Sequence, residues 1–148
     1  MINYPKEDQK ITLCTTAGAH VAGMVNVAGR SLSTYLQDAE PDIIMYETEL
    51  SENKKQNTLM VSKRQTLWIS SGEDLEKDPL GCWQRLSFKL VNGQVIVGEI
   101  DITGYDRVSD YVQRYQNRFY EVFDCTINGE SRTALFVSTR YTMWKEPL

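Results

Sequence analysis

The sequence predicts an all-β protein built from two tandem five-stranded barrels that arose by internal duplication. Three observations lead to this prediction. The second half of the chain repeats the first in register, each half alternates apolar and polar residues in short runs, and the runs end at turn signals rich in Gly, Asn and Ser. With 148 residues, the chain has room for one ordinary domain or two very small ones.

The repeat emerges when the chain is aligned with itself. At an offset of 75 positions, one glutamine and three glycines recur unchanged: Gln9 and Gln84, Gly18 and Gly93, Gly23 and Gly98, Gly29 and Gly104. After one extra residue in the second copy the offset becomes 76, and LMVSKRQTLW (59–68) then lies on LFVSTRYTMW (135–144) with six identities in order. So many ordered matches with a single slip indicate a tandem duplication.

Each copy is predicted to begin with a hairpin. The strands ITL (11–13) and LSFKL (86–90) lead into Gly-centred turns, and Asn-Gly at 92–93 is a strong hairpin signal. The second strands, HVAGMVNV (20–27) and VIVGEIDI (95–102), each carry an interior glycine. Such a glycine marks a bulge or sharp bend, which a small sheet needs in order to curl into a barrel.

Three further strands complete each copy. DIIMYET (42–48) and RFYEVFDCTI (118–127) are the third strands, and very short connections at 63–64 and 139–140 join the fourth to the fifth. The long connections 28–41 and 103–117 are predicted loops, and long loops are often functional. The predicted domains are 1–72 and 80–148, with a linker at 73–79 in which 73–78 could form one helical turn. A short helix over 5–9 is the counterpart in the first copy.

Bulk composition excludes several classes of function. No apolar run approaches the roughly 20 residues that span a bilayer, and the start MINYPKEDQK lacks the apolar core of a signal peptide, so we expect a cytoplasmic protein without membrane attachment. Three widely spaced cysteines and the single His20 give no metal-ligand pattern. No nucleophile–base pair assembles either, because Ser109 and Asp110 have no partner base. We therefore expect no metal, no cofactor and no enzymatic activity.

Motifs in both copies resemble those of a known family. LVNGQVIVGEI (90–100) is similar to the first Sm motif, in which an apolar strand, an Asn-Gly turn, a spacing of four residues and a second glycine precede an apolar residue. The segments 61–69 and 137–145 lie where the second Sm motif would join the last two strands. Both halves therefore look like Sm-like domains, which are small SH3-like barrels, and the resemblance covers nearly the whole chain outside the linker.

Two departures from the Sm pattern bear on function. The turn that usually follows the second glycine and supplies an RNA-holding Asn is replaced by the longer DRVSDY (106–111). The Arg-Gly of the second motif is replaced by Lys63-Arg64 and Thr139-Arg140. Longer loops of this type look like those of uncharacterised bacterial Sm-like domains.

The resemblance implies self-association. An open barrel of this kind leaves strands unpaired at its edge, and Sm-like domains pair the fourth strand of one with the fifth of the next in a closed ring. With two copies per chain, three chains would make a pseudo-hexamer, while direct pairing of the halves or a simple dimer is the alternative. Trp68 and Trp144, at matched positions of the last strands, are expected to be core or subunit-interface residues.

Six residues are candidates for contacting single-stranded RNA. In Sm-like rings the turn carrying Lys63, Arg64 and Arg140 faces the pore, where arginine would recognise phosphate or guanine. The loop residues Arg107, Tyr111 and Tyr115 combine guanidinium and aromatic groups that suit stacking on unpaired bases. The same residue types suit a protein interface, and a polar turn needs no ligand at all.

The sequence therefore leaves two candidate functions. We expect an oligomeric Sm-like protein that binds single-stranded RNA through basic loops near a ring pore. The alternative is a non-enzymatic protein-interaction or scaffold module without RNA binding, which accounts better for a net charge of −4 and a pI near 5.0.

Overall fold

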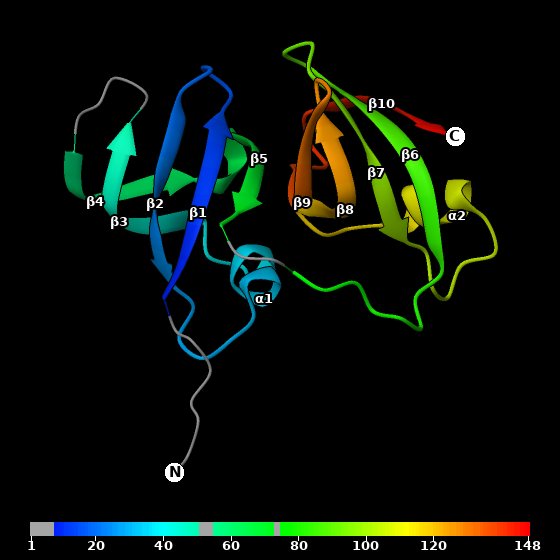
Figure 1. The fold of residues 1–148 in the computed structure, drawn as a ribbon, viewed down its shortest axis with the longest axis horizontal. Helices are drawn as coiled ribbons and strands as arrows, with labels where there is room; N and C mark the ends of the chain where they lie inside the picture. Colours follow the sequence, from blue (N-terminus) through cyan, green and yellow to red (C-terminus); the bar gives the residue numbers. More distant parts are fainter. Residues whose placement is uncertain (1–7, 51–54, 73–74) are drawn as a thin grey trace. The chain divides into compact units, whose positions relative to one another are not determined.

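The computed structural model describes residues 8–50, 55–72 and 75–148, and it confirms the all-β class (Figure 1). The chain divides into two compact units, Met1–Glu73 and Asp74–Leu148. Within each unit every pair of neighbouring strands is antiparallel. In its described residues, each unit has five strands and one short α-helix.

Unit 1 contains five strands, one α-helix and one turn of 3₁₀-helix. Its elements are β1 (Asp8–Thr15), β2 (His20–Asn26), α1 (Leu32–Gln37), β3 (Asp42–Leu50), β4 (Lys55–Ser62), η1 (Lys63–Gln65) and β5 (Thr66–Ser71). The strand order across the sheet is β5-β1-β2-β3-β4.

Unit 2 repeats this arrangement of strands. Its elements are β6 (Trp83–Leu90), β7 (Val95–Asp101), α2 (Val108–Arg114), β8 (Phe119–Ile127), β9 (Glu130–Ser138) and β10 (Thr142–Pro147). The strand order is β10-β6-β7-β8-β9. In both units the fifth strand therefore lies beside the first, and the fourth and fifth strands end the order.

The predicted bulges at the interior glycines are confirmed in both units. Gly23 faces Ile11 across the β1–β2 pair, and Gly98 faces Leu86 across β6–β7. The register with the next strand shifts at each glycine, between Ala22 and Met24 and between Val97 and Glu99. A residue with positive φ follows on that next strand, Glu47 at 49° and Asp124 at 45°.

Close approach of two strands explains why these positions are glycine. A Cβ on Gly98 would lie 2.5 Å from both the Cβ of Cys125 and the Cγ1 of Val122. At Gly23 the nearest atom is the Cγ2 of Thr48, at 2.9 Å. Any side chain would therefore force the bulge apart.

Buried and more exposed side chains alternate along the second strand of unit 1 and the first two strands of unit 2, so one face of these strands contributes to the core, whereas β5 and β9 bury runs of consecutive residues. In β6 the buried residues are Leu86, Phe88 and Leu90, and β1 buries Ile11 and Leu13 in the same way. Each such side chain stabilises the fold by about 1.5–3 kcal/mol on full burial. Alternation of this kind is what the short apolar runs of the sequence predict.

The two long connections each contain one short helix, where loops were predicted. The Oγ of Ser31 accepts a hydrogen bond from the backbone N of Thr34 at 3.1 Å and so caps α1, while Leu32 and Leu36 bury one face of the helix. The signal was present in the sequence as an N-cap followed by an i, i+4 leucine pair.

The helical turn predicted over 73–78 is wrong for its described residues, 75–78, which form no helix. Asp78 precedes Pro79, which disfavours helical backbone at Asp78, and Lys77 instead reaches Glu99 and Asp124 at 2.8 and 3.0 Å. Of the helix predicted over 5–9, residues 5–7 lie outside the described part, and Asp8 and Gln9 begin β1.

Candidate functional site

The turn after the fourth strand carries three of the predicted RNA-binding residues. In unit 1 this turn is η1, and in unit 2 it is residues 139–141. A threonine closes it in both units, since Thr66 Oγ1 donates to Ser62 O at 2.8 Å and Thr142 Oγ1 donates to Ser138 O at 2.7 Å. The same threonine hydrogen bond thus closes both turns, and the turns differ in their other side chains.

Lys63 points into unit 1 and not into solvent. Its side chain is only 1% exposed, and its Nζ lies 2.7 Å from Oδ1 of Asp38. The same ammonium donates to the backbone oxygens of Tyr35 at 3.2 Å and of Asp38 at 3.4 Å. Lys63 therefore holds the segment after α1 against the turn, and its charge is neutralised within the chain.

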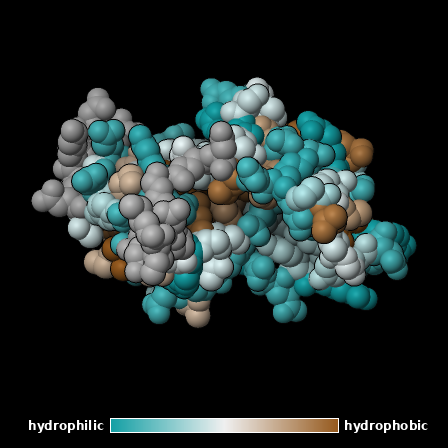
Figure 2. All heavy atoms as spheres, turned by 60° about the horizontal axis from the view of Figure 1, so that its bottom comes forward, coloured by the Kyte–Doolittle hydropathy of each residue, from teal (hydrophilic) through white to brown (hydrophobic). Residues whose placement is uncertain are grey.

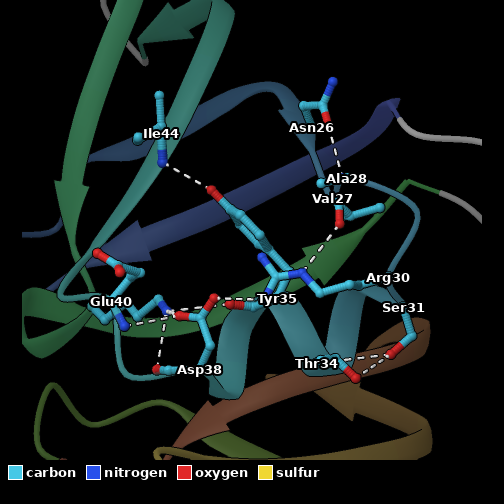
Figure 3. Close-up of polar contacts among 11 residues, drawn as sticks. Asn26, Val27, Ala28, Arg30, Ser31, Thr34, Tyr35, Asp38, Glu40 and Ile44 are labelled. Atoms are coloured by element: carbon cyan, nitrogen blue, oxygen red, sulfur yellow. Dashed lines mark hydrogen bonds and ion pairs between the residues drawn. The ribbon is translucent and has the colours of Figure 1, made fainter.

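Arg30 completes this cluster in unit 1, as Figure 3 shows. Its Nη1 lies 3.0 Å from Oδ2 of Asp38, and its guanidinium lies 5.6 Å from the centre of the Tyr35 ring. The Tyr35 hydroxyl accepts from the backbone N of Ile44 at 3.1 Å. The hydrogen bond from Lys63 is the main cause that holds the pKa of Asp38 below its usual value, and Arg30 adds to it.

In unit 2 the turn is held by a neutral side chain. Thr139 Oγ1 lies 3.0 Å from the backbone oxygens of both Asn117 and Arg118, and its single hydroxyl hydrogen is shared between these two acceptors. Its neighbour Arg140 is exposed, with its guanidinium 5.7 Å from the ring centre of Tyr141. Arg64, at the equivalent place in unit 1, is also exposed.

The tyrosines around α2 pack on one another. The ring centres of Tyr105 and Tyr111 are 5.4 Å apart, those of Tyr111 and Tyr115 are 5.0 Å apart, and those of Tyr115 and Tyr120 are also 5.0 Å apart. Tyr111 is buried, which raises its pKa, and the Tyr115 hydroxyl donates to the backbone oxygen of Phe119. These rings form a small aromatic core under the helix.

The six predicted residues therefore fall into two groups. Lys63 and Tyr111 are buried, and Tyr115 is half-buried in the tyrosine stack. The guanidinium groups are exposed: Arg107, which pairs with Asp110 at 3.2 Å, and those of the two turns. The helix α2 brings Arg107, Tyr111 and Tyr115 together, whereas Arg64 and Arg140 belong to different units.

Large apolar side chains are exposed on strands that end the order of each unit or adjoin such a strand. In unit 2, Met143 and Trp144 of β10 are 50% and 53% exposed. In unit 1, Ile44 of β3 and Met60 of β4 face each other in register and are 54% and 69% exposed. Figure 2 shows that hydrophobic residues reach the surface as separate brown areas among hydrophilic ones.

The matched tryptophans differ sharply in exposure. Trp68 of β5 is only 3% exposed and meets the ring of His20 edge-on at 5.6 Å between centres. Trp144 occupies the same place in the repeat and is half exposed.

Comparison with known proteins gives no family. No family model, curated protein or solved structure matches the chain. None of the helices in the described residues is long and apolar enough to cross a membrane. Function must therefore be argued from the side chains themselves.

Sequence reasoning missed the cluster of Arg30, Tyr35 and Asp38. Two signals for it were available, because Arg30 and Asp38 flank a short apolar helix and carry opposite charges. What the sequence did not show is that a fourth member, Lys63, joins them from a turn 25 residues further along the chain than Asp38.

Proposed function

We propose that the chain is a non-enzymatic, self-assembling module made of two Sm-like barrels. The strand order supports this proposal. In each unit the fifth strand lies beside the first and the fourth lies at the other end, so the fourth and fifth strands are the ends through which Sm-like domains join. Equal registers and equal bulges at Gly23 and Gly98 support descent of both units from one barrel.

The exposure of Trp144 is the observation that carries the assembly. Its counterpart Trp68 is buried, while Trp144 keeps 53% of its surface in solvent beside Met143. Covering half of a tryptophan removes on the order of 100 Å² of apolar surface from water, which favours association by about 2–3 kcal/mol. Tryptophan is also enriched at the centres of protein interfaces.

The partner that fits this strand is β4 of a second copy. In Sm-like assemblies the fifth strand of one domain pairs with the fourth strand of the next, and β10 and β4 are the fifth and fourth strands of units 2 and 1. Met60 of β4 is 69% exposed and supplies apolar surface to meet Trp144. Joining β10 to β4 from chain to chain closes a ring of three chains with six barrels.

Light scattering coupled to size-exclusion chromatography tests the assembly. The expected mass is three times the 17.0 kDa of one chain. A mass of one chain at micromolar concentration contradicts the proposal outright. A mass of two chains contradicts the ring and favours a dimer.

RNA binding is a second candidate, favoured by one specific observation. The guanidinium groups of Arg64, Arg107 and Arg140 are exposed. In a ring of three chains they would recur three times each and concentrate positive charge on an acidic body. Two of the six expected contacts, Lys63 and Tyr111, are buried, and we rank this function second for that reason.

The double substitution Arg64→Ala and Arg140→Ala tests RNA binding. The wild-type protein should bind short single-stranded RNA at low salt and lose affinity steeply as salt rises. The variant should bind more weakly by about 1–3 kcal/mol per lost bidentate contact, and Arg132→Ala, which removes another partly exposed arginine, serves as the control. Absence of binding by wild-type protein at low salt eliminates this candidate.

A further inference from the structure

Unit 2 carries a small cavity whose walls are aromatic and acidic. The cavity measures about 220 Å³ and is lined by the aromatic side chains of Trp83, Tyr111 and Phe123. Its other lining residues are all acidic: Glu76, Asp78, Asp101 and Glu121. It is smaller than the roughly 300–1,000 Å³ of sites for drug-sized molecules, so it fits a single small group.

Among the described residues, no cation forms an ion pair with the four carboxylates of this cavity. Glu76 and Glu121 make no ion pair in the described part of the chain. Asp101 uses Oδ1 to accept from the backbone N of Cys82 at 3.0 Å and of Thr103 at 2.9 Å. Burial acts to raise the pKa of Asp101, yet the hydrogen bond from the Thr103 hydroxyl, together with these two backbone bonds, holds it below its usual value, which favours the charged carboxylate.

Trp83, one of the aromatic residues of the cavity, already contacts a cation that does not line the cavity. The Nζ of Lys77 lies 4.8 Å from the ring centre of Trp83, and it is held there by Glu99 and Asp124. Neither of these two acids lines the cavity, so the ammonium leaves the four cavity carboxylates uncompensated. Trp83 also meets Phe123 edge-on, with 5.2 Å between ring centres, which fixes the wall.

Unit 1 shows what occupies the equivalent region there. The tyrosine four residues after the helix N-cap is Tyr35 in unit 1 and Tyr111 in unit 2. The residue before the N-cap is Arg30 in unit 1, whose guanidinium lies against Tyr35 and is held by Asp38. In unit 2 that position is Asp106, so unit 2 replaces the arginine by another acid.

We propose that this cavity binds the guanidinium of an arginine side chain presented by a peptide segment. A guanidinium is planar, carries five N–H donors in a fork that matches carboxylates, and stacks on aromatic faces, so it uses both kinds of wall. None of the lining residues belongs to β10, and the inference therefore stands whether or not the chain assembles through that strand.

Nuclear magnetic resonance titration of the full chain with argininamide, without added salt, tests the proposal. Argininamide lacks the free carboxylate of arginine and so mimics a residue inside a peptide. Saturable shifts are expected at the indole N–H of Trp83 and at the amide of Glu121, with millimolar affinity for so small a ligand. Lysinamide, tetramethylammonium and free arginine are the comparison ligands.

Two variants with the same change of net charge complete the test. Glu121→Gln removes one cavity carboxylate from a half-buried position and should weaken argininamide binding about tenfold. Glu146→Gln removes an exposed carboxylate of β10 that does not line the cavity, and it should leave binding unchanged. Circular dichroism of both variants verifies that they remain folded.

Each result of the titration either supports or contradicts the proposal. Argininamide binding that is tighter than lysinamide and tetramethylammonium binding, and that weakens only in Glu121→Gln, supports it. No saturable shift with argininamide overturns it. Equal binding of all cations, or equal weakening in both variants, also overturns it, because either result means non-specific attraction to an acidic surface. Tighter binding of free arginine assigns the cavity to the amino acid and overturns the peptide ligand.

Discussion

The ammonium of Lys63 lies 2.7 Å from the Oδ1 atom of Asp38, with the lysine side chain 1% exposed and the aspartate side chain 18% exposed. This pair joins the turn after β4 to Asp38, the residue that directly follows α1. A charge taken out of water in this way is tolerated only because acceptors surround it, and two backbone oxygens add to the carboxylate. The pair is therefore a structural clamp of unit 1.

Replacing Lys63 by methionine should destabilise unit 1. Breaking a fully buried pair typically costs about 3–5 kcal/mol, and the expected cost here is about 2–3 kcal/mol because Asp38 keeps Arg30 and some contact with water. Urea unfolding measures it. Arg64→Met, one residue along the same turn but exposed, is the control and should cost within about 0.5 kcal/mol. Equal stability of the two variants would show that the clamp is not stabilising.

The same pair predicts how unit 1 responds to acid. Because Lys63 lowers the pKa of Asp38 in the folded state, the stabilisation is complete above the unfolded value, near 3.9, and is lost as the pH falls through the lower folded value. The wild-type protein should therefore lose stability below about pH 4, and Lys63→Met should lose less over that range. Titration of the Asp38 carboxyl by carbon-13 resonance measures the shift directly. A normal pKa for Asp38 in the wild-type protein would refute this.

The two bulge glycines should differ in their tolerance of alanine. A Cβ on Gly98 would lie 2.5 Å from two side-chain carbons, whereas a Cβ on Gly23 would lie 2.9 Å from its nearest neighbour. Overpacking of this kind costs typically 1–3 kcal/mol, so we expect about 3 kcal/mol for Gly98→Ala and about 1–2 kcal/mol for Gly23→Ala. Thermal unfolding of both variants gives the ranking. The reverse order would mean that the bulge in β7 relaxes more easily than its close contacts indicate.

Substitutions on β10 and β4, the strands proposed to pair between chains, should dissociate the proposed assembly into single chains. Trp144→Ser and Met60→Ser each remove exposed apolar surface and should each lower the mass measured by light scattering at a given concentration. Leu80→Ser is the matched control, since Leu80 is 88% exposed and lies on neither strand. An unchanged mass in both strand variants, with an assembled wild-type protein, would place the interface elsewhere.

Local signals made most of the strands predictable. Gly18 and Gly93 adopt positive φ in the first turn of each unit, which the Gly-centred turn signals predicted. The interior glycines likewise marked the bulges, because a missing side chain is visible in the sequence. Such features depend on residues that are neighbours in the chain or lie directly across a hairpin.

The candidate site was less predictable because its contacts come from distant segments. Nothing near Lys63 in the sequence shows that Asp38 lies beside it, and a Lys-Arg pair in a turn is normally solvated. Trp68 and Trp144 have nearly the same local sequence, yet one is buried and the other is half exposed. Tyr111 was predicted to stack on bases, and in the structure its ring meets Tyr105 edge-on and lies tilted against Tyr115, contacts that its local sequence does not reveal.

Different side chains hold the two turns, so the residues at equivalent positions of the units cannot be exchanged freely. Placing the threonine of unit 2 at position 63 removes the ammonium and leaves Asp38 paired with Arg30 alone among the described residues. Placing a lysine at position 139 brings its ammonium to a place where, counting from the helix N-cap, Arg114 stands in place of Asp38. Each exchange therefore disturbs the charge balance of its own unit, so position 63 is coupled to position 38 and position 139 to position 114.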